Sequence, residues 1–218
     1  MKFFIDTANL DQIKEAQELG ILDGVTTNPS LMAKEGIKGE ANIYNHYKEI
    51  CGIVSGDVSA EVISTDYNGM VAEGEVLSAL HPQIVVKVPC TREGIKAIKY
   101  LSGKGIKTNC TLIFSPGQAL LAAKAGATYV SPFIGRLDDV STDGIELIAK
   151  IVDMYHFYGF ETQVLAASIR HTLHIIQCVE AGADVVTSPL GPILGLLNHP
   201  LTDIGIEKFL SDYRKSCM

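Results

Sequence analysis

Short apolar runs alternate along the chain with longer segments whose apolar residues recur at helical spacing. Several runs, such as IVVKVP and ADVVTSP, are apolar almost throughout, which is typical of parallel strands covered on both faces. The pattern predicts eight strands, each followed by a helix, at residues 2–6, 24–27, 58–63, 84–89, 107–112, 127–133, 162–168 and 184–188.

Residues at the ends of the predicted helices support this alternation. Asn9 with Gln12 has the pattern of a capping box after the first strand. Asn28 and Ser115 each precede a proline, as N-cap residues often do. A glycine stands before five of the strands, as expected where a helix ends: Gly20, Gly105, Gly126, Gly159 and Gly182.

Eight βα units in 218 residues average about 27 residues each, close to the unit size of a (β/α)8, or TIM, barrel. We therefore expect an α/β protein with a single barrel domain over residues 1–218. The alternative is a doubly wound open sheet, which would need fewer strands and a glycine-rich loop that KFFIDTANL lacks. Within residues 202–218 we expect an amphipathic C-terminal helix that docks on its own barrel or on a neighbouring copy.

Composition narrows the possible functions. The hydrophobic share of 47% excludes intrinsic disorder, and the net charge of −7 argues against a nucleic-acid or anionic-membrane surface. A small basic pocket for an anionic metabolite stays possible. The five cysteines form no Cys-x-x-Cys motif, and the N-terminus lacks a signal-peptide pattern. We expect a cytosolic protein with reduced thiols and no membrane-spanning helix.

Lys87 is the only charge in the apolar strand IVVKVP. Burying an ammonium costs several kcal/mol unless it is paired or neutral, and a neutral amine is a nucleophile. The structural alternatives are a lysine that extends to solvent from an edge strand and a lysine held in an ion pair. In a barrel, chemistry lies at the carboxyl ends of the strands, which favours a catalytic role for Lys87.

Other polar residues stand at predicted strand ends. Asp6 and Glu61 are expected to face the same cavity as Lys87, although one of them could be only its salt-bridge partner. Asn28, Asn109 and Thr111 could be turn or cap residues singly, but together they indicate a site for substrate hydroxyl groups.

Two arginines follow neighbouring strands. Arg136 and Arg170, with Ser168 nearby, could bind a phosphate, or the arginines could pair with surface carboxylates. His171 and His174 lack a metal-binding pattern, so we predict no metal site.

Four segments together resemble the signature segments of the transaldolase family: DTAN, GVTTNPS, VKVP and SPFIGR. The match is to the short subfamily, which also includes fructose-6-phosphate aldolase, and it covers essentially the whole chain in family order. The resemblance implies a TIM barrel that transfers a dihydroxyacetone unit in the pentose phosphate pathway. The donor would be sedoheptulose 7-phosphate or fructose 6-phosphate, and the acceptor glyceraldehyde 3-phosphate or erythrose 4-phosphate. It implies no metal or organic cofactor, and homo-oligomers such as pentamers or decamers formed through the C-terminal helix.

The resemblance also assigns roles. Lys87 matches the lysine that forms a Schiff base, and Asp6 matches the acid/base that takes and returns the C4-hydroxyl proton. Glu61 and Thr111 match the pair that holds the catalytic water. Asn28 and Asn109 match residues that bind the donor hydroxyl groups and the dihydroxyacetone unit, and Ser131 matches a further substrate contact. The phosphate site is matched by Arg136, Ser168 and Arg170.

Two positions bear on the reaction type. Aldolase-type members typically carry Gln in place of Glu61 and Tyr in place of Phe133, so both residues favour a transferase. A lyase that splits fructose 6-phosphate is the alternative. A catalytically silent sugar-phosphate-binding barrel would be expected to lose Lys87 or Asp6, and this chain has both.

Overall fold

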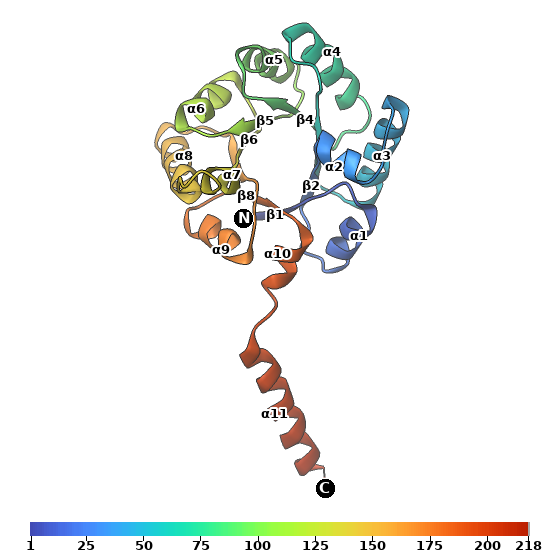
Figure 1. Ribbon diagram of the computed structural model, residues 1–218, viewed down its shortest axis with the longest axis vertical. Helices are drawn as coiled ribbons and strands as arrows, with labels where there is room; N and C mark the ends of the chain where they lie inside the picture. Colours follow the sequence, from blue (N-terminus) through green and yellow to red (C-terminus); the bar gives the residue numbers. More distant parts are fainter. Residues whose placement is uncertain (218) are drawn as a thin grey trace.

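The computed structural model describes residues 1–217 and has the predicted TIM-barrel architecture (Figure 1). All neighbouring strands pair in parallel and close in chain order, from β1 next to β2 around to β8 next to β1. The strands are β1 (Lys2–Asp6), β2 (Gly24–Thr26), β3 (Asp57–Glu61), β4 (Ile84–Pro89), β5 (Thr108–Ile113), β6 (Tyr129–Pro132), β7 (Gln163–Ala166) and β8 (Val185–Ser188).

All eight predicted strands are present, and the differences lie at their ends. The prediction carried the sixth and seventh strands on to Phe133 and Ser168, but these strands end earlier. Phe133 and Ala167 form only an isolated bridge, and Ser168 has a φ of 62°, which no regular strand adopts. The chain turns out of the ladder at these positions and carries the following residues over the mouth of the barrel.

Helices surround the barrel (Figure 1). Asn9, Asn28 and Ser115 cap helices as predicted, since each side chain accepts a backbone N–H of the first turn. The prediction of a capping box at Asn9 is wrong in one detail. The N–H of Asn9 donates to Oγ1 of Thr7 at 3.1 Å, and that hydroxyl donates to Gln12 at 2.8 Å, so Thr7 stands between the two partners. The helices are α1 (Leu10–Glu18), α2 (Pro29–Lys34), α3 (Glu40–Ile53), α4 (Tyr67–Ser78), α5 (Arg92–Gly103), α6 (Pro116–Ala125), α7 (Ile134–Asp138), α8 (Gly144–Tyr158), α9 (Thr172–Glu180), α10 (Leu190–Gly195) and α11 (Pro200–Ser216).

A plug of apolar side chains fills the barrel toward the ends at which the strands begin. Phe4, Val85, Tyr129 and Val185 pack together there with two further residues, and the rings of Phe4 and Tyr129 meet edge to face at 6.0 Å. Gly24 makes room for this plug, because a Cβ at that position would lie 2.6 Å from the ring of Phe4. Side chains alternate between faces along a strand, so the next inward-facing residues stand two positions further on.

Helix α11 projects away from the barrel (Figure 1). It begins at Pro200, two residues before the predicted segment 202–218, ends at Ser216, and has no buried residue. Its apolar residues include Phe209, which is 73% exposed, and Tyr213, which is 68% exposed. The helix therefore does not dock on its own barrel; Met218 lies outside the described residues. No helix within residues 1–217 has the length and hydrophobicity needed to cross a membrane.

Candidate active site

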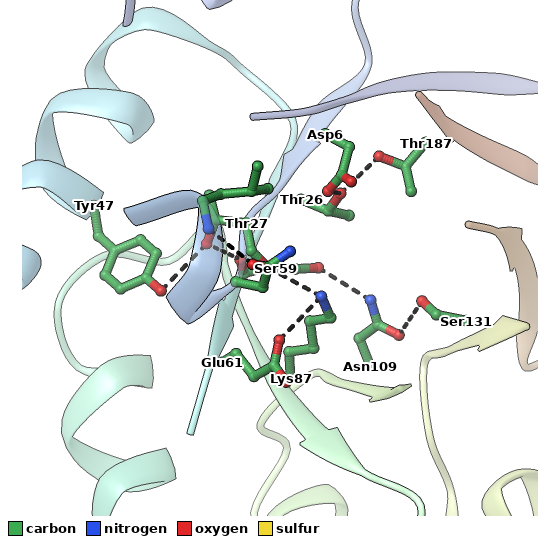
Figure 2. Close-up of polar contacts among 12 residues, drawn as sticks. Asp6, Thr26, Thr27, Tyr47, Ser59, Glu61, Lys87, Asn109, Ser131 and Thr187 are labelled. Carbon is green, nitrogen blue, oxygen red and sulfur yellow. Dashed lines mark hydrogen bonds and ion pairs between the residues drawn. The ribbon is translucent and has the colours of Figure 1, made fainter. Parts of the chain in front are cut away.

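Lys87 lies in a layer of polar side chains directly above the plug, two residues after Val85 (Figure 2). Its side chain is buried, and Nζ donates to the carbonyl oxygen of Thr27 at 3.0 Å. Nζ also forms an ion pair with Oε2 of Glu61 at 3.1 Å. Of the alternatives weighed from the sequence, extension to solvent is excluded, and Lys87 is a paired, buried lysine at the heart of the barrel.

The carbonyl that holds Lys87 is itself fixed in place. The hydroxyl of Thr27 donates to the carbonyl oxygen of Ser59 at 3.0 Å and lies 3.2 Å from the hydroxyl of Tyr47 (Figure 2). Burial raises the pKa of Tyr47, so this phenol keeps its proton. The lysine is thus positioned by the residue that follows β2, by β3 and by α3.

The two carboxylates lie on different sides of Lys87. Asp6 lines the same cavity as Lys87, as predicted, but the distances place it in no ion pair with the lysine. Glu61 pairs with Lys87 across β3 and β4, where the two residues are in register. Glu61 also lines a neighbouring, mainly apolar cavity beside Met32 and Tyr47. The expectation that both carboxylates face the cavity of Lys87 is therefore correct for Asp6 and wrong for Glu61, which pairs with Lys87 but lines the neighbouring cavity.

Buried amide and hydroxyl groups continue the polar layer. Asn109 donates to Oγ of Ser59 at 3.2 Å and accepts from Oγ of Ser131 at 2.8 Å (Figure 2). Ser131 lines the cavity. Asn28 also lines it, although its side chain caps α2 by accepting the N–H of Leu31 at 2.9 Å. Asn28 is thus both the N-cap of α2 and a residue of the cavity wall.

Thr111 completes the set of polar residues predicted on β5. It follows Asn109 with the same facing, and its Oγ1 is buried with no hydrogen-bond partner among residues 1–217. A buried hydroxyl without a partner is costly in a folded protein, so such groups usually meet a ligand or a water. Thr111 does not line the cavity that contains Lys87, so the structure leaves its predicted place in the site as an expectation.

The arginines flank the mouth of the cavity. Arg136, Ser168 and Arg170 all line it. Arg170 also pairs with Asp139 at 2.7 Å, which is the surface pairing that the sequence left open. Gly135 lets α7, which carries Arg136, approach the loop that carries Arg170, because a Cβ at Gly135 would lie 2.3 Å from the carbonyl oxygen of Ser168.

The two histidines beside this mouth have structural contacts. Nδ1 of His171 accepts the N–H of His174, and Nε2 of His174 lies 3.0 Å from Asp138. Burial, followed by the adjacent His171, lowers the pKa of His174. Across the described part of the chain, no three His, Cys, Asp or Glu side chains are grouped to hold a metal ion.

Two polar residues of the cavity wall were missed by sequence reasoning. Thr26 and Thr187 line the cavity together with Asp6 and Lys87. Their signal was the alternation along the strands, since Thr26 stands two residues after Gly24 and Thr187 two residues after Val185. Threonine is common in any strand, so residue type alone did not distinguish them.

The cavity has a volume of about 250 Å³ and a mixed lining. Lys87 and Asp6 lie within it, the two arginines lie at its rim, and Phe133 forms an apolar part of its wall. The ring of Phe133 packs edge to face on Phe114 at 6.0 Å. Such a cavity suits a small, polar, anionic molecule with one apolar face.

Solved structures of known proteins share the fold. A thiamine phosphate pyrophosphorylase from Pyrococcus furiosus superposes with a TM-score of 0.60 at 16% sequence identity, over 85% of this chain and 84% of that one. At this identity the likeness shows the barrel architecture alone.

Sequence comparisons identify the family. The family model described as "Transaldolase/Fructose-6-phosphate aldolase" matches residues 3–217. Proteins named "Probable transaldolase" from Phocaeicola vulgatus and Parabacteroides distasonis are each 74% identical over 215 residues, covering 99% of this chain and 99% of each relative. One of the same name from Cytophaga hutchinsonii is 72% identical over the same length. The chain therefore belongs to the transaldolase/fructose-6-phosphate aldolase family.

Proposed function

We propose that the protein is a transaldolase that moves a dihydroxyacetone unit from a ketose phosphate to an aldose phosphate through a Schiff base on Lys87. The observation that carries this proposal is the position of Lys87, a residue that is 4% exposed yet lines the cavity with Asp6 and both arginines. A buried amine beside a carboxylate and an anion-binding rim suits covalent catalysis on a phosphorylated carbonyl compound.

The first step makes Lys87 nucleophilic. Glu61 lies 3.1 Å from Nζ and can accept the ammonium proton, which leaves a neutral amine to attack C2 of the ketose. Loss of water from the adduct gives the iminium ion. Glu61 ends β3 and Thr111 lies on β5, so they flank β4 from its two neighbouring strands. In this proposal they hold the water that leaves and later returns.

The second step breaks the C3–C4 bond. Asp6 takes the proton of the C4 hydroxyl, and the oxygen electron pair becomes the C4 carbonyl bond. The C3–C4 electron pair becomes the enamine double bond, and the iminium nitrogen receives the displaced pair. An aldose phosphate leaves, and the three-carbon enamine stays on Lys87 until an acceptor aldehyde arrives.

The remaining residues recognise the substrate in this proposal. Asn28, Asn109 and Ser131 bind hydroxyl groups next to the reacting carbons. Arg136, Ser168 and Arg170 bind the phosphate at the rim, and for this Arg170 would exchange or share its partner Asp139. Fructose 6-phosphate and sedoheptulose 7-phosphate are the proposed donors, in the pentose phosphate pathway of the cytoplasm.

Phe133 and Glu61 favour a transferase over a lyase. An enamine is released as free dihydroxyacetone only after it is protonated, and that requires a proton donor beside it. Phe133 gives the cavity wall an apolar ring with no hydroxyl group to donate or to position a water. The alternative function is fructose-6-phosphate aldolase, and it would require the enamine to be protonated despite this wall.

The test measures glyceraldehyde 3-phosphate released from fructose 6-phosphate, with and without erythrose 4-phosphate. Release that depends on the acceptor supports a transaldolase, whereas equal release without it indicates the aldolase. Borohydride reduction in the presence of fructose 6-phosphate should attach a sugar adduct to Lys87. Persistent labelling of a Lys87→Ala variant would contradict the Schiff-base assignment.

The exposed helix α11 fits a homo-oligomer. Its apolar side chains lie away from the barrel that carries it, and a second copy of this chain would bury them. In this proposal the partners of the protein are its sugar phosphates and further copies of itself, with no nucleic acid or membrane involved.

A further inference from the structure

A chain of three side chains leads from β8 to the carboxylate of Asp6. Oγ1 of Thr187 and Oγ1 of Thr26 lie 2.6 Å apart, and Oγ1 of Thr26 donates to Oδ1 of Asp6 at 2.7 Å (Figure 2). Both threonines are buried, with exposures of 2% and 1%. All three residues stand on neighbouring strands, because β8, β1 and β2 are consecutive around the barrel.

The direction of these hydrogen bonds follows from the number of protons that each hydroxyl group can donate. A threonine hydroxyl has one proton to donate and two lone pairs to accept with. The proton of Thr26 goes to Asp6, so in the contact between the two threonines the donor must be Thr187. The hydrogen bonds therefore run one way, from Thr187 to Thr26 to Asp6.

The chain occupies only one oxygen of Asp6. Oδ1 accepts the proton of Thr26, while Oδ2 has no hydrogen-bond partner within residues 1–217. A carboxylate anchored through one oxygen has its orientation set, and its other oxygen is left to meet the substrate. The hydroxyl that anchors it cannot turn away without losing the bond from Thr187.

We propose that Thr187 is a positioning residue for the reaction, acting on Asp6 through Thr26. The inference rests on the proposed function, because it assigns to Asp6 the C4-hydroxyl proton. By donating a hydrogen bond to Thr26, Thr187 keeps the hydroxyl of Thr26 in place as a donor to Asp6. The carboxylate is thereby oriented so that Oδ2 faces the reacting C4 hydroxyl. Thr187 itself exchanges no proton with the substrate in this role.

This role separates two steps of the reaction. Schiff-base formation on Lys87 needs Glu61 and does not use Asp6, whereas cleavage of the C3–C4 bond needs Asp6. Loss of Thr26 should slow cleavage by roughly tenfold to a hundredfold, the equivalent of one hydrogen bond to a charged group. Loss of Thr187 should slow it less, by about threefold to tenfold, since Thr26 can still reach Asp6 without it.

The experiment compares Thr26→Val, Thr187→Val and the double variant, all nearly isosteric with the wild type. Each enzyme is mixed with fructose 6-phosphate, reduced with borohydride and analysed by mass spectrometry, while release of glyceraldehyde 3-phosphate is followed in a single turnover. We expect both single variants to accumulate the intact hexose-phosphate adduct at the expense of the three-carbon adduct. Thr187→Ser, which keeps the hydroxyl, should cleave at close to the wild-type rate.

The double variant gives the decisive result. If Thr187 acts through Thr26, Thr187→Val should have no further effect once Thr26 is valine. Thr108→Val is the matched control, because Thr108 is a buried strand threonine whose Oγ1 has no partner among the described residues. It should leave both adducts unchanged.

Three outcomes would overturn the proposal in distinguishable ways. If the wild type forms no borohydride-trapped adduct, the proposed function fails and the positioning role fails with it. If the wild type is trapped but the two valine substitutions slow cleavage additively, the proposed function stands and Thr187 does not act through Thr26. An equal loss of adduct formation and cleavage in both Thr187→Val and Thr187→Ser would likewise assign Thr187 a merely structural role.

Discussion

Glu61→Gln should destabilise the protein, because it leaves the ammonium of Lys87 buried without its counter-ion. The side chain of Lys87 is 5% exposed, and Nζ lies 3.1 Å from Oε2 of Glu61. At that distance and an effective dielectric constant of about 20, the attraction is about 5 kcal/mol. Breaking a buried pair by removing one partner typically costs about 3–5 kcal/mol. We expect about 3 kcal/mol, because the amide oxygen of glutamine can still accept a hydrogen bond.

Urea unfolding at equilibrium measures this loss directly, and thermal unfolding should show a fall in Tm of roughly 6–12 °C. Lys87→Met is the matched control. It leaves Glu61, whose side chain is 16% exposed and can be hydrated, so it should cost about 1 kcal/mol or less. The double variant should be more stable than Glu61→Gln alone. The reasoning is refuted if Glu61→Gln unfolds within 1 kcal/mol of the wild type, or if the two substitutions destabilise additively.

Three further predictions concern the rim of the barrel and its tail. Arg136→Ala or Arg170→Ala should raise the KM for fructose 6-phosphate far more than for dihydroxyacetone as donor; equal effects on both substrates would remove the arginines from the phosphate site. The lowered pKa of His174 predicts that the wild type loses stability as the pH falls below about 6.5, since the unfolded chain then binds the extra proton more readily. A His174→Gln variant should lose less stability between pH 7.5 and pH 5 in urea titrations, and an unchanged loss would contradict the shift. Removal of residues 200–218 should reduce the oligomer to smaller species in analytical ultracentrifugation without unfolding the barrel, and an unchanged mass would exclude α11 from the interface.

The barrel could be predicted from the sequence because its signals are local. Continuous apolar runs mark strands covered on both faces, and caps such as Asn28 and Ser115 mark where the helices begin. The ends of β6 and β7 could not be predicted in this way. Ser168 has a positive φ where its carbonyl packs closely on Gly135 of α7, and that contact joins segments far apart in the chain.

The residues of the site also differ in how far the sequence alone could predict them. Lys87 and Asp6 stood out because a charge in an apolar strand is conspicuous whatever surrounds it. Thr26 and Thr187 did not, since a threonine is ordinary in a strand and their contact joins residues 161 positions apart. Their role depends on which strands are neighbours, and only the closure of β8 onto β1 brings them to Asp6.

The polar residues of the site can have a structural role in the free protein and a catalytic role in the proposed reaction without changing place. A polar layer inside a barrel is costly unless each group has a partner, and here many of the partners come from the protein itself. Glu61 balances Lys87, Asp139 holds Arg170, and the helix that begins after Asn28 occupies its side chain. Each of these contacts stabilises the free protein, and in the proposed reaction each is also one that a sugar phosphate must share or replace. A residue that pairs with its neighbour in the free barrel is therefore already positioned to act on the sugar of the proposed reaction. For this reason, an ion pair found at Lys87 does not weigh against a catalytic lysine.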